Sequence, residues 1–144
     1  MEKIKYSNIL KRDFVNTTIV YNKLSPSGEK EGAMKIIYNS FFPFGSFWAI
    51  NLFGYVFCRV DKGRLPETAK NHEYIHSLQQ KELFYIGFYL LYIAEWLYHL
   101  ARLRNFMKAY YALSFEREAY TMQGDMNYKY KRKKFANFRL GLKG

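Results

Sequence analysis

The spacing of hydrophobic and polar positions changes near residue 60. Before it, residues 17–24 (TTIVYNKL) and 33–39 (AMKIIYN) are rich in β-branched and aromatic side chains, and the intervening SPSGEKEG is typical of turns. We therefore expect a β-hairpin. Residues 47–60 have a similar composition, and Gly54 among them indicates a bulge or bend in a strand. The pattern predicts three or four strands in this part of the chain.

After a loop with the sequence DKGRLP, the hydrophobic positions recur with helical spacing almost to the end of the chain. This pattern predicts three helices, near residues 67–82, 84–104 and 109–134. Strands followed by helices are typical of an α+β fold, here a small N-terminal antiparallel sheet packed against a C-terminal helical part. A single domain spanning 1–144 accounts for the length of the chain, with 1–60 mainly strands, 67–134 mainly helices and 127–144 a basic tail.

The segment from His72 to His76 reads His-Glu-x-x-His and falls inside the first predicted helix. Residues four apart project from nearly the same helix face, so both imidazoles can bind one metal ion. From its offset position, Glu73 can reach a water on that metal and act as general base. The segment therefore predicts a zinc site with a catalytic Glu73.

A catalytic zinc ion commonly has three protein ligands, so two histidines leave one to be found elsewhere. From residue type alone the candidates are His99, Glu116, Glu118 and Asp125. His99 follows Glu95 by four residues, and an ion pair with that glutamate explains it better than metal binding. A third histidine six residues beyond the motif, which would define a metzincin, is absent.

The segment from Ser114 to Tyr120, SFEREAY, resembles the E-x-x-A signature of gluzincin metallopeptidases. The wider order of motifs resembles small zincin-like proteins of bacteria. The resemblance implies a zincin-like fold in which Glu116 completes the zinc site and Ala119 allows close helix approach. Glu118, on another helix face, is the competing ligand.

Related peptidases commonly place an aspartate after the E-x-x-A alanine, where this chain has Tyr120. That aspartate orients a zinc-bound histidine by accepting its second ring proton. Here Asp125, Glu118 or a backbone carbonyl would have to substitute. Donors for a developing oxyanion are, by residue type, Tyr120, Arg117, His99 and Tyr111. Residues 47–52 (FWAINL) are the candidate edge strand for holding an extended peptide.

The net charge of +11, with 23 Lys and Arg against 12 Asp and Glu, favours acidic partners such as anionic lipid, nucleic acid or acidic peptides. Seven of these cations lie in the tail 127–144, interleaved with Tyr and Phe. No nucleic-acid module accompanies them, so nucleic acid is the least favoured partner. Peripheral association with an anionic membrane is the better supported alternative.

A hydrophobic share of 49% and an aromatic share of 20% exclude intrinsic disorder. The uncharged run 41–58 contains Pro43, Gly45 and Gly54, which suit bent strands better than a membrane helix. The helix predicted at 84–104 is apolar nearly all round, so it is either core or docked to lipid or a partner. The N-terminal residues show no signal peptide, and the single Cys58 suits the reducing cytoplasm.

Two functional hypotheses follow from these patterns. The first is a zinc-dependent metallopeptidase or peptidase-like hydrolase acting on a peptide or protein substrate, with His72, His76 and Glu116 on zinc and Glu73 as general base. The second is a non-catalytic, zinc-stabilised module that binds an anionic membrane or a protein partner through its basic aromatic surface.

Overall fold

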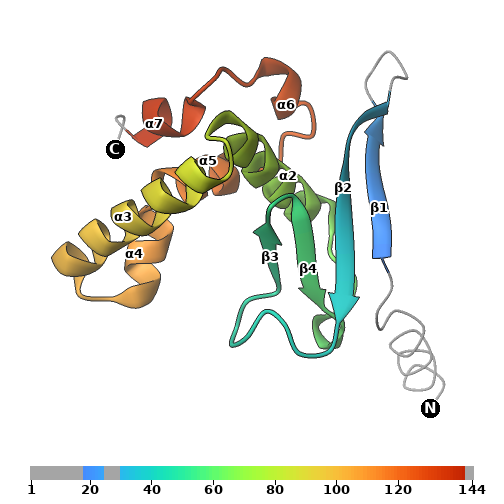
Figure 1. The fold of residues 1–144 in the computed structure, drawn as a ribbon, viewed down its shortest axis with the longest axis horizontal. Coiled ribbons are helices and arrows are strands. Elements are labelled where there is room, and N and C mark those ends of the chain that lie inside the picture. The colour runs from blue at the N-terminus through green and yellow to red at the C-terminus, as the bar shows by residue number, and fades with distance from the viewer. Residues whose placement is uncertain (1–17, 25–29, 142–144) are drawn as a thin grey trace. The chain divides into compact units, whose positions relative to one another are not determined.

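The computed structural model describes residues 18–24 and 30–141, and the chain divides after Pro66 into two compact units. The first unit is a small mixed sheet and the second is helical, which confirms the α+β class (Figure 1). The four strands are β1 (Thr18–Leu24), β2 (Lys30–Asn39), β3 (Ala49–Leu52) and β4 (Tyr55–Arg59). A short 3₁₀ helix, η1 (Val60–Lys62), follows them.

The sheet has the order β1-β2-β4-β3. β1 and β2 form the expected antiparallel hairpin, and β3 and β4 form a second antiparallel hairpin. The prediction of a wholly antiparallel sheet is wrong, because β4 lies parallel to β2. After β2, a long connection leads to β3 at the edge of the sheet. The chain then turns back, and β4 lies between β2 and β3. β3 is thereby an edge strand, as expected for residues 47–52.

Gly54 lies between β3 and β4, so it does not bend a strand as expected. It forms the turn of the second hairpin together with Phe53, and both residues have positive φ, at 81° and 53°. Two successive left-handed residues are what a two-residue hairpin turn of the favoured twist requires. Asn51 supports this turn, because its side-chain oxygen accepts a hydrogen bond from the Gly54 backbone N–H.

The core of the first unit follows the period of two expected of strands. Along β2, Met34, Ile36 and Tyr38 are buried and alternate with more exposed residues. Val56 and Cys58 are buried in the same way on β4. This unit thus has its own small apolar core.

The helical unit contains six helices among the described residues. They are α2 (Glu67–Glu82), α3 (Ile86–Leu103), α4 (Phe106–Ala112), α5 (Ser114–Met122), α6 (Tyr128–Lys131) and α7 (Ala136–Gly141). The predicted helix at 67–82 is confirmed, and the one at 84–104 is confirmed in large part. α2 cannot continue into α3, because Phe84 and Tyr85 both have positive φ.

The single helix predicted at 109–134 is wrong, because the structure breaks it into α4, α5 and α6. The first break is at Leu113, whose ψ of 133° is extended. Directly after it, the backbone N–H and the hydroxyl of Ser114 both donate to the carboxylate of Glu95, at 2.8 Å each. Glu95 belongs to α3, so a tertiary contact caps the start of α5.

Among the described residues, no single helix is long and apolar enough to cross a membrane. The pair α2 and α3 passes that test only when taken together, and the two are bent by 111° at the break between them.

Candidate metal centre

His72 and His76 lie one turn apart on α2 and face the same side of that helix. Their Nε2 atoms are 3.1 Å apart, and their rings meet edge-on with centroids separated by 4.8 Å. Both side chains are buried. The structure therefore brings the two imidazole nitrogens together, as the His-Glu-x-x-His spacing predicts.

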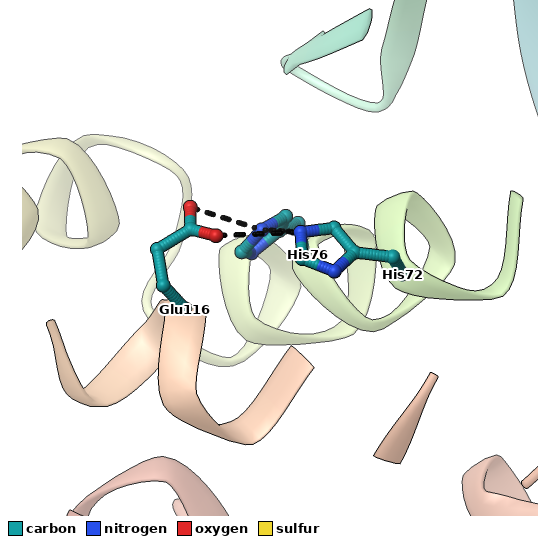
Figure 2. A group of neighbouring side chains, drawn as sticks. All are labelled: His72, His76 and Glu116. Atoms are coloured by element: carbon teal, nitrogen blue, oxygen red, sulfur yellow. Dashed lines mark hydrogen bonds and ion pairs between the residues drawn. The ribbon is translucent and has the colours of Figure 1, made fainter. Parts of the chain in front are cut away.

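Glu116 reaches this pair from the first turn of α5. Its Oε2 lies 3.3 Å from Nε2 of His72, and its Oε1 lies 3.2 Å from Nε2 of His76. Figure 2 shows the carboxylate pointing from its own helix toward the two rings on α2. One ligand atom from each side chain lies within 4.8 Å of the others, so these three buried residues form a group that could hold a metal ion.

The ring of His76 is oriented by Gln79, three residues further along α2. The Nδ1 atom of His76 lies 2.8 Å from Oε1 of Gln79. The amide of Gln79 is itself oriented, because its Nε2 donates to the Phe115 carbonyl and to the Glu118 carboxylate. Since Oε1 can only accept, Nδ1 of His76 donates to it, and Nε2 is the ring nitrogen that faces the centre.

His72 is held differently. Its Nδ1 is buried and has no hydrogen-bond partner among the described residues. None of the expected substitutes for an orienting aspartate bonds to this atom. Instead, the ring of Tyr120 packs edge-on against the imidazole, with centroids 4.5 Å apart. Tyr120 therefore fixes this ring by packing, where an aspartate would do so by hydrogen bonding.

Glu118 does not join the two histidines, although it is only two residues from Glu116. It is fully buried, and its carboxylate accepts hydrogen bonds from Arg132, with Nε at 2.6 Å, and from the Tyr128 hydroxyl at 3.0 Å. Arg132 also donates to Glu82 at 2.7 Å. Glu118 therefore belongs to a buried ion-pair network behind the centre, and it reaches His76 only through Gln79.

α3 contributes two aromatic residues that the sequence patterns did not single out. The hydroxyl of Tyr92 donates to Oε1 of Glu116 at 2.7 Å. The ring of Phe88 packs against His76 and against Phe115, with centroids 6.3 and 4.9 Å apart. Because most residues of this helix are apolar or aromatic, its sequence carried no signal that would mark these two.

The charges of the centre are strongly coupled. Burial alone would lower the pKa of His76, but the Glu116 carboxylate outweighs this effect and raises the pKa to about 9. Burial would raise the pKa of Glu116, yet His76 and His72 hold it well below its usual range. Without a metal ion, a proton on His76 therefore balances the charge of Glu116.

Glu73, the predicted general base, lies on α2 beside the two histidines and is buried. Burial raises the pKa of this carboxyl, the two histidines lower it, and Glu116 raises it further. The net result is a pKa above the ordinary value. A carboxyl group of this kind binds a proton more readily than an exposed glutamate does.

The remaining sequence candidates lie outside the group. Nε2 of His99 is 3.7 Å from Oε1 of Glu95, which confirms the predicted pairing. Asp125 forms an ion pair with Lys131. Ala119, expected to allow close approach of two helices, is fully buried in a cluster with Ile75 of α2.

Comparison of the chain with protein-family models, with curated proteins and with solved structures finds no match in any of the three.

Proposed function

We propose that this chain is a zinc-dependent metallopeptidase or a closely related peptidase-like hydrolase. In this proposal His72, His76 and Glu116 hold the metal ion, and Glu73 is the general base. The observation that carries the proposal is the arrangement of three buried ligand atoms contributed by two separate helices. The resemblance of HEYIH and SFEREAY to gluzincin motifs points to the same chemistry.

The spacing of the donor atoms suits zinc. Zinc binds histidine nitrogen and carboxylate oxygen at roughly 2.0–2.2 Å in tetrahedral geometry, so its ligand atoms lie about 3.3 Å from one another. The Nε2 atoms of the two histidines are 3.1 Å apart, and each has one carboxylate oxygen of Glu116 nearby, Oε2 at 3.3 Å from His72 and Oε1 at 3.2 Å from His76. In addition, Oε2 of Glu116 is buried and accepts no hydrogen bond among the described residues, and Nε2 of His72 lies 3.3 Å from it. A cation at the centre would satisfy that atom.

Bound zinc would supply a Lewis acid that polarises a scissile carbonyl and lowers the pKa of water. Glu73 would then accept a proton from the attacking water and pass it to the leaving amine. Its raised pKa supports both steps, because the protonated form of this carboxyl is easier to reach than in an exposed glutamate.

Tyr120 is the best placed of the four candidate oxyanion donors. Its ring touches His72 and its side chain is 40% exposed, so the residue borders both the centre and the solvent. Partial burial and the nearby Glu116 carboxylate raise its pKa to about 12. The phenol therefore stays protonated at neutral pH and can donate a hydrogen bond to a developing oxyanion.

Metal analysis combined with two kinds of variant tests this proposal. Purified protein should contain about one zinc per chain, and His72→Ala and Glu116→Ala should each lower zinc affinity more than about 100-fold, the upper range for residues that only support a ligand. Glu73→Gln should keep the zinc and lose cleavage of a peptide library. A native protein without affinity for zinc would refute the proposal.

The Glu73→Gln variant also separates catalysis from a structural metal. If the parent protein binds zinc but cleaves no peptide, the centre would be a structural one and the non-catalytic module would be correct. If both proteins cleave at the same rate, Glu73 is not the base.

A further inference from the structure

The outward face of α3 is an uninterrupted aliphatic stripe. Ile86, Leu90, Ile93 and Leu97 recur with helical spacing, and each side chain is more than half exposed. A surface helix normally places polar residues on this face. Phe88 is the only buried residue of α3.

The tip where α3 meets α4 combines apolar and cationic side chains. The exposed apolar residues are Leu103, Phe106 and Met107, and the exposed cations are Arg102, Arg104 and Lys108. No acidic residue occurs between Glu95 and Glu116. Figure 1 shows α3 and α4 side by side, forming a helical hairpin (residues 86–112) whose tip lies away from α2.

We propose that this helical hairpin docks on the surface of an anionic lipid bilayer. The aliphatic stripe would enter the boundary between headgroups and acyl chains, while the three tip cations would contact lipid phosphate and carboxylate groups. A bilayer suits a convex stripe, because acyl chains adapt to its shape and no matching groove is needed. A second copy of this chain would bury the stripe but would leave the tip cations without acidic partners, since the same segment of that copy has none.

Docking in this way has a consequence for the candidate metal centre. The inner face of α3 carries Tyr92, whose hydroxyl donates a hydrogen bond to Glu116, whereas the outer face carries the aliphatic stripe. The centre would therefore lie about one helix diameter, roughly 10 Å, from the lipid surface. This consequence rests on the proposed function, but the docking itself does not.

Vesicle flotation with the full chain tests the proposal, using vesicles of phosphatidylcholine alone or mixed with phosphatidylserine. The protein should float with the mixed vesicles, and added salt should weaken this binding. Leu90→Gln combined with Leu97→Gln should reduce binding more than tenfold, because two apolar side chains no longer leave water. Both positions are exposed, so the far-UV circular dichroism spectrum should not change.

Cation variants locate the charged contact. Arg104→Gln combined with Lys108→Gln should reduce binding about fivefold for each charge removed. Lys133→Gln combined with Lys134→Gln is the matched control, because it removes the same charge from exposed positions between α6 and α7, well away from the tip in Figure 1. This control should have the smaller effect, because charges beyond a Debye length of about 10 Å from the lipid are screened.

Several results would overturn the proposal. One is no flotation with anionic vesicles, and another is a larger loss in the control than in the hairpin variants. A dimer in solution that the two leucine substitutions convert to a monomer, without vesicle binding, would show that a second copy covers the stripe. Retention on immobilised polyglutamate, lost in the leucine variant and again without vesicle binding, would assign the face to an acidic protein partner.

Discussion

α2 and α3 are consecutive helices of one compact unit, yet they distribute their residues in opposite ways. α2 buries polar side chains, among them His72, His76 and Gln79. α3 exposes aliphatic ones, such as Leu90 and Leu97. Burying polar groups costs free energy unless each finds a partner, and exposing a long apolar stripe leaves surface that would be more stable out of water. Both departures from ordinary patterning are expected where a helix serves a function and not only the core.

The two helices should also differ in how substitutions on them affect the fold. The polar face of α2 depends on partners in α5 and beyond, so a single substitution there should propagate to the metal centre. The side chains on the apolar face of α3 are more than half exposed, so substitutions there should leave the fold unchanged. The following predictions test this contrast.

The largest effect is expected at Arg132, which pairs with Glu118 and Glu82. Arg132→Met would leave the fully buried Glu118 carboxylate without its cation, and removing one partner of a buried pair costs about 3–5 kcal/mol. Urea unfolding measures this loss. Lys131→Met is the matched control, because the Lys131 pair with Asp125 is exposed and contributes at most about 1 kcal/mol. Equal losses in the two variants would contradict the network described above.

A smaller effect is expected at Gln79. Gln79→Met removes the acceptor for Nδ1 of His76 and should lower zinc affinity about 10–100-fold, as loss of a partner behind a metal ligand typically does. Competition with a chelator of known affinity measures the change. Leu78→Met, at the half-buried neighbouring position, should leave zinc affinity unchanged. An unchanged affinity in Gln79→Met would mean that packing alone orients His76.

In the metal-free protein, His76 should make the free energy of unfolding depend on pH. Its pKa is raised from 6.5 to about 9 in the folded state, so the stabilisation is complete below pH 6.5 and is lost as the pH rises toward 9. The free energy of unfolding should therefore fall across this window, as followed by urea unfolding in the presence of a chelator. Glu116→Gln should flatten the slope, because it removes the charge that raises the pKa of His76.

Zinc should reverse this dependence. A metal ion competes with the proton on His76, so the stabilisation that zinc adds should grow over the same pH range. If zinc-loaded and metal-free protein lost stability in parallel, the metal would be bound elsewhere.

The smallest effect is expected on the outer face of α3. Leu97→Gln should change the free energy of unfolding by less than about 0.5 kcal/mol, because its side chain is more than half exposed. Ile75→Ala on α2 is the contrasting variant and should cost roughly 2–5 kcal/mol, since that side chain is fully buried. Thermal or urea unfolding compares the two. A large loss in Leu97→Gln would mean that the stripe is covered within the molecule.

Local spacing determined much of the centre. His72 and His76 are four residues apart within one helix, so helix geometry alone places their rings on a common face. The hairpin of β1 and β2 and the boundaries of α2 were likewise predictable, because turn residues and hydrophobic period act over a few positions. Gln79 could have been found by the same reasoning, since it follows His76 by three residues and shares its face.

Contacts between distant segments decided the rest. Whether Glu116 or Glu118 faces the histidines depends on how α5 rotates about its axis, and that rotation is fixed by packing of Ala119 against Ile75 and by the pairing of Glu118 with Arg132. The break before Ser114 depends on Glu95, 19 residues earlier in the chain. The parallel pairing of β2 with β4 depends on which strands become neighbours in the sheet. The alternation of buried and exposed residues along a strand does not encode this choice. Sequence therefore determined which side chains were available within each helix or strand, and tertiary packing determined which of them meet.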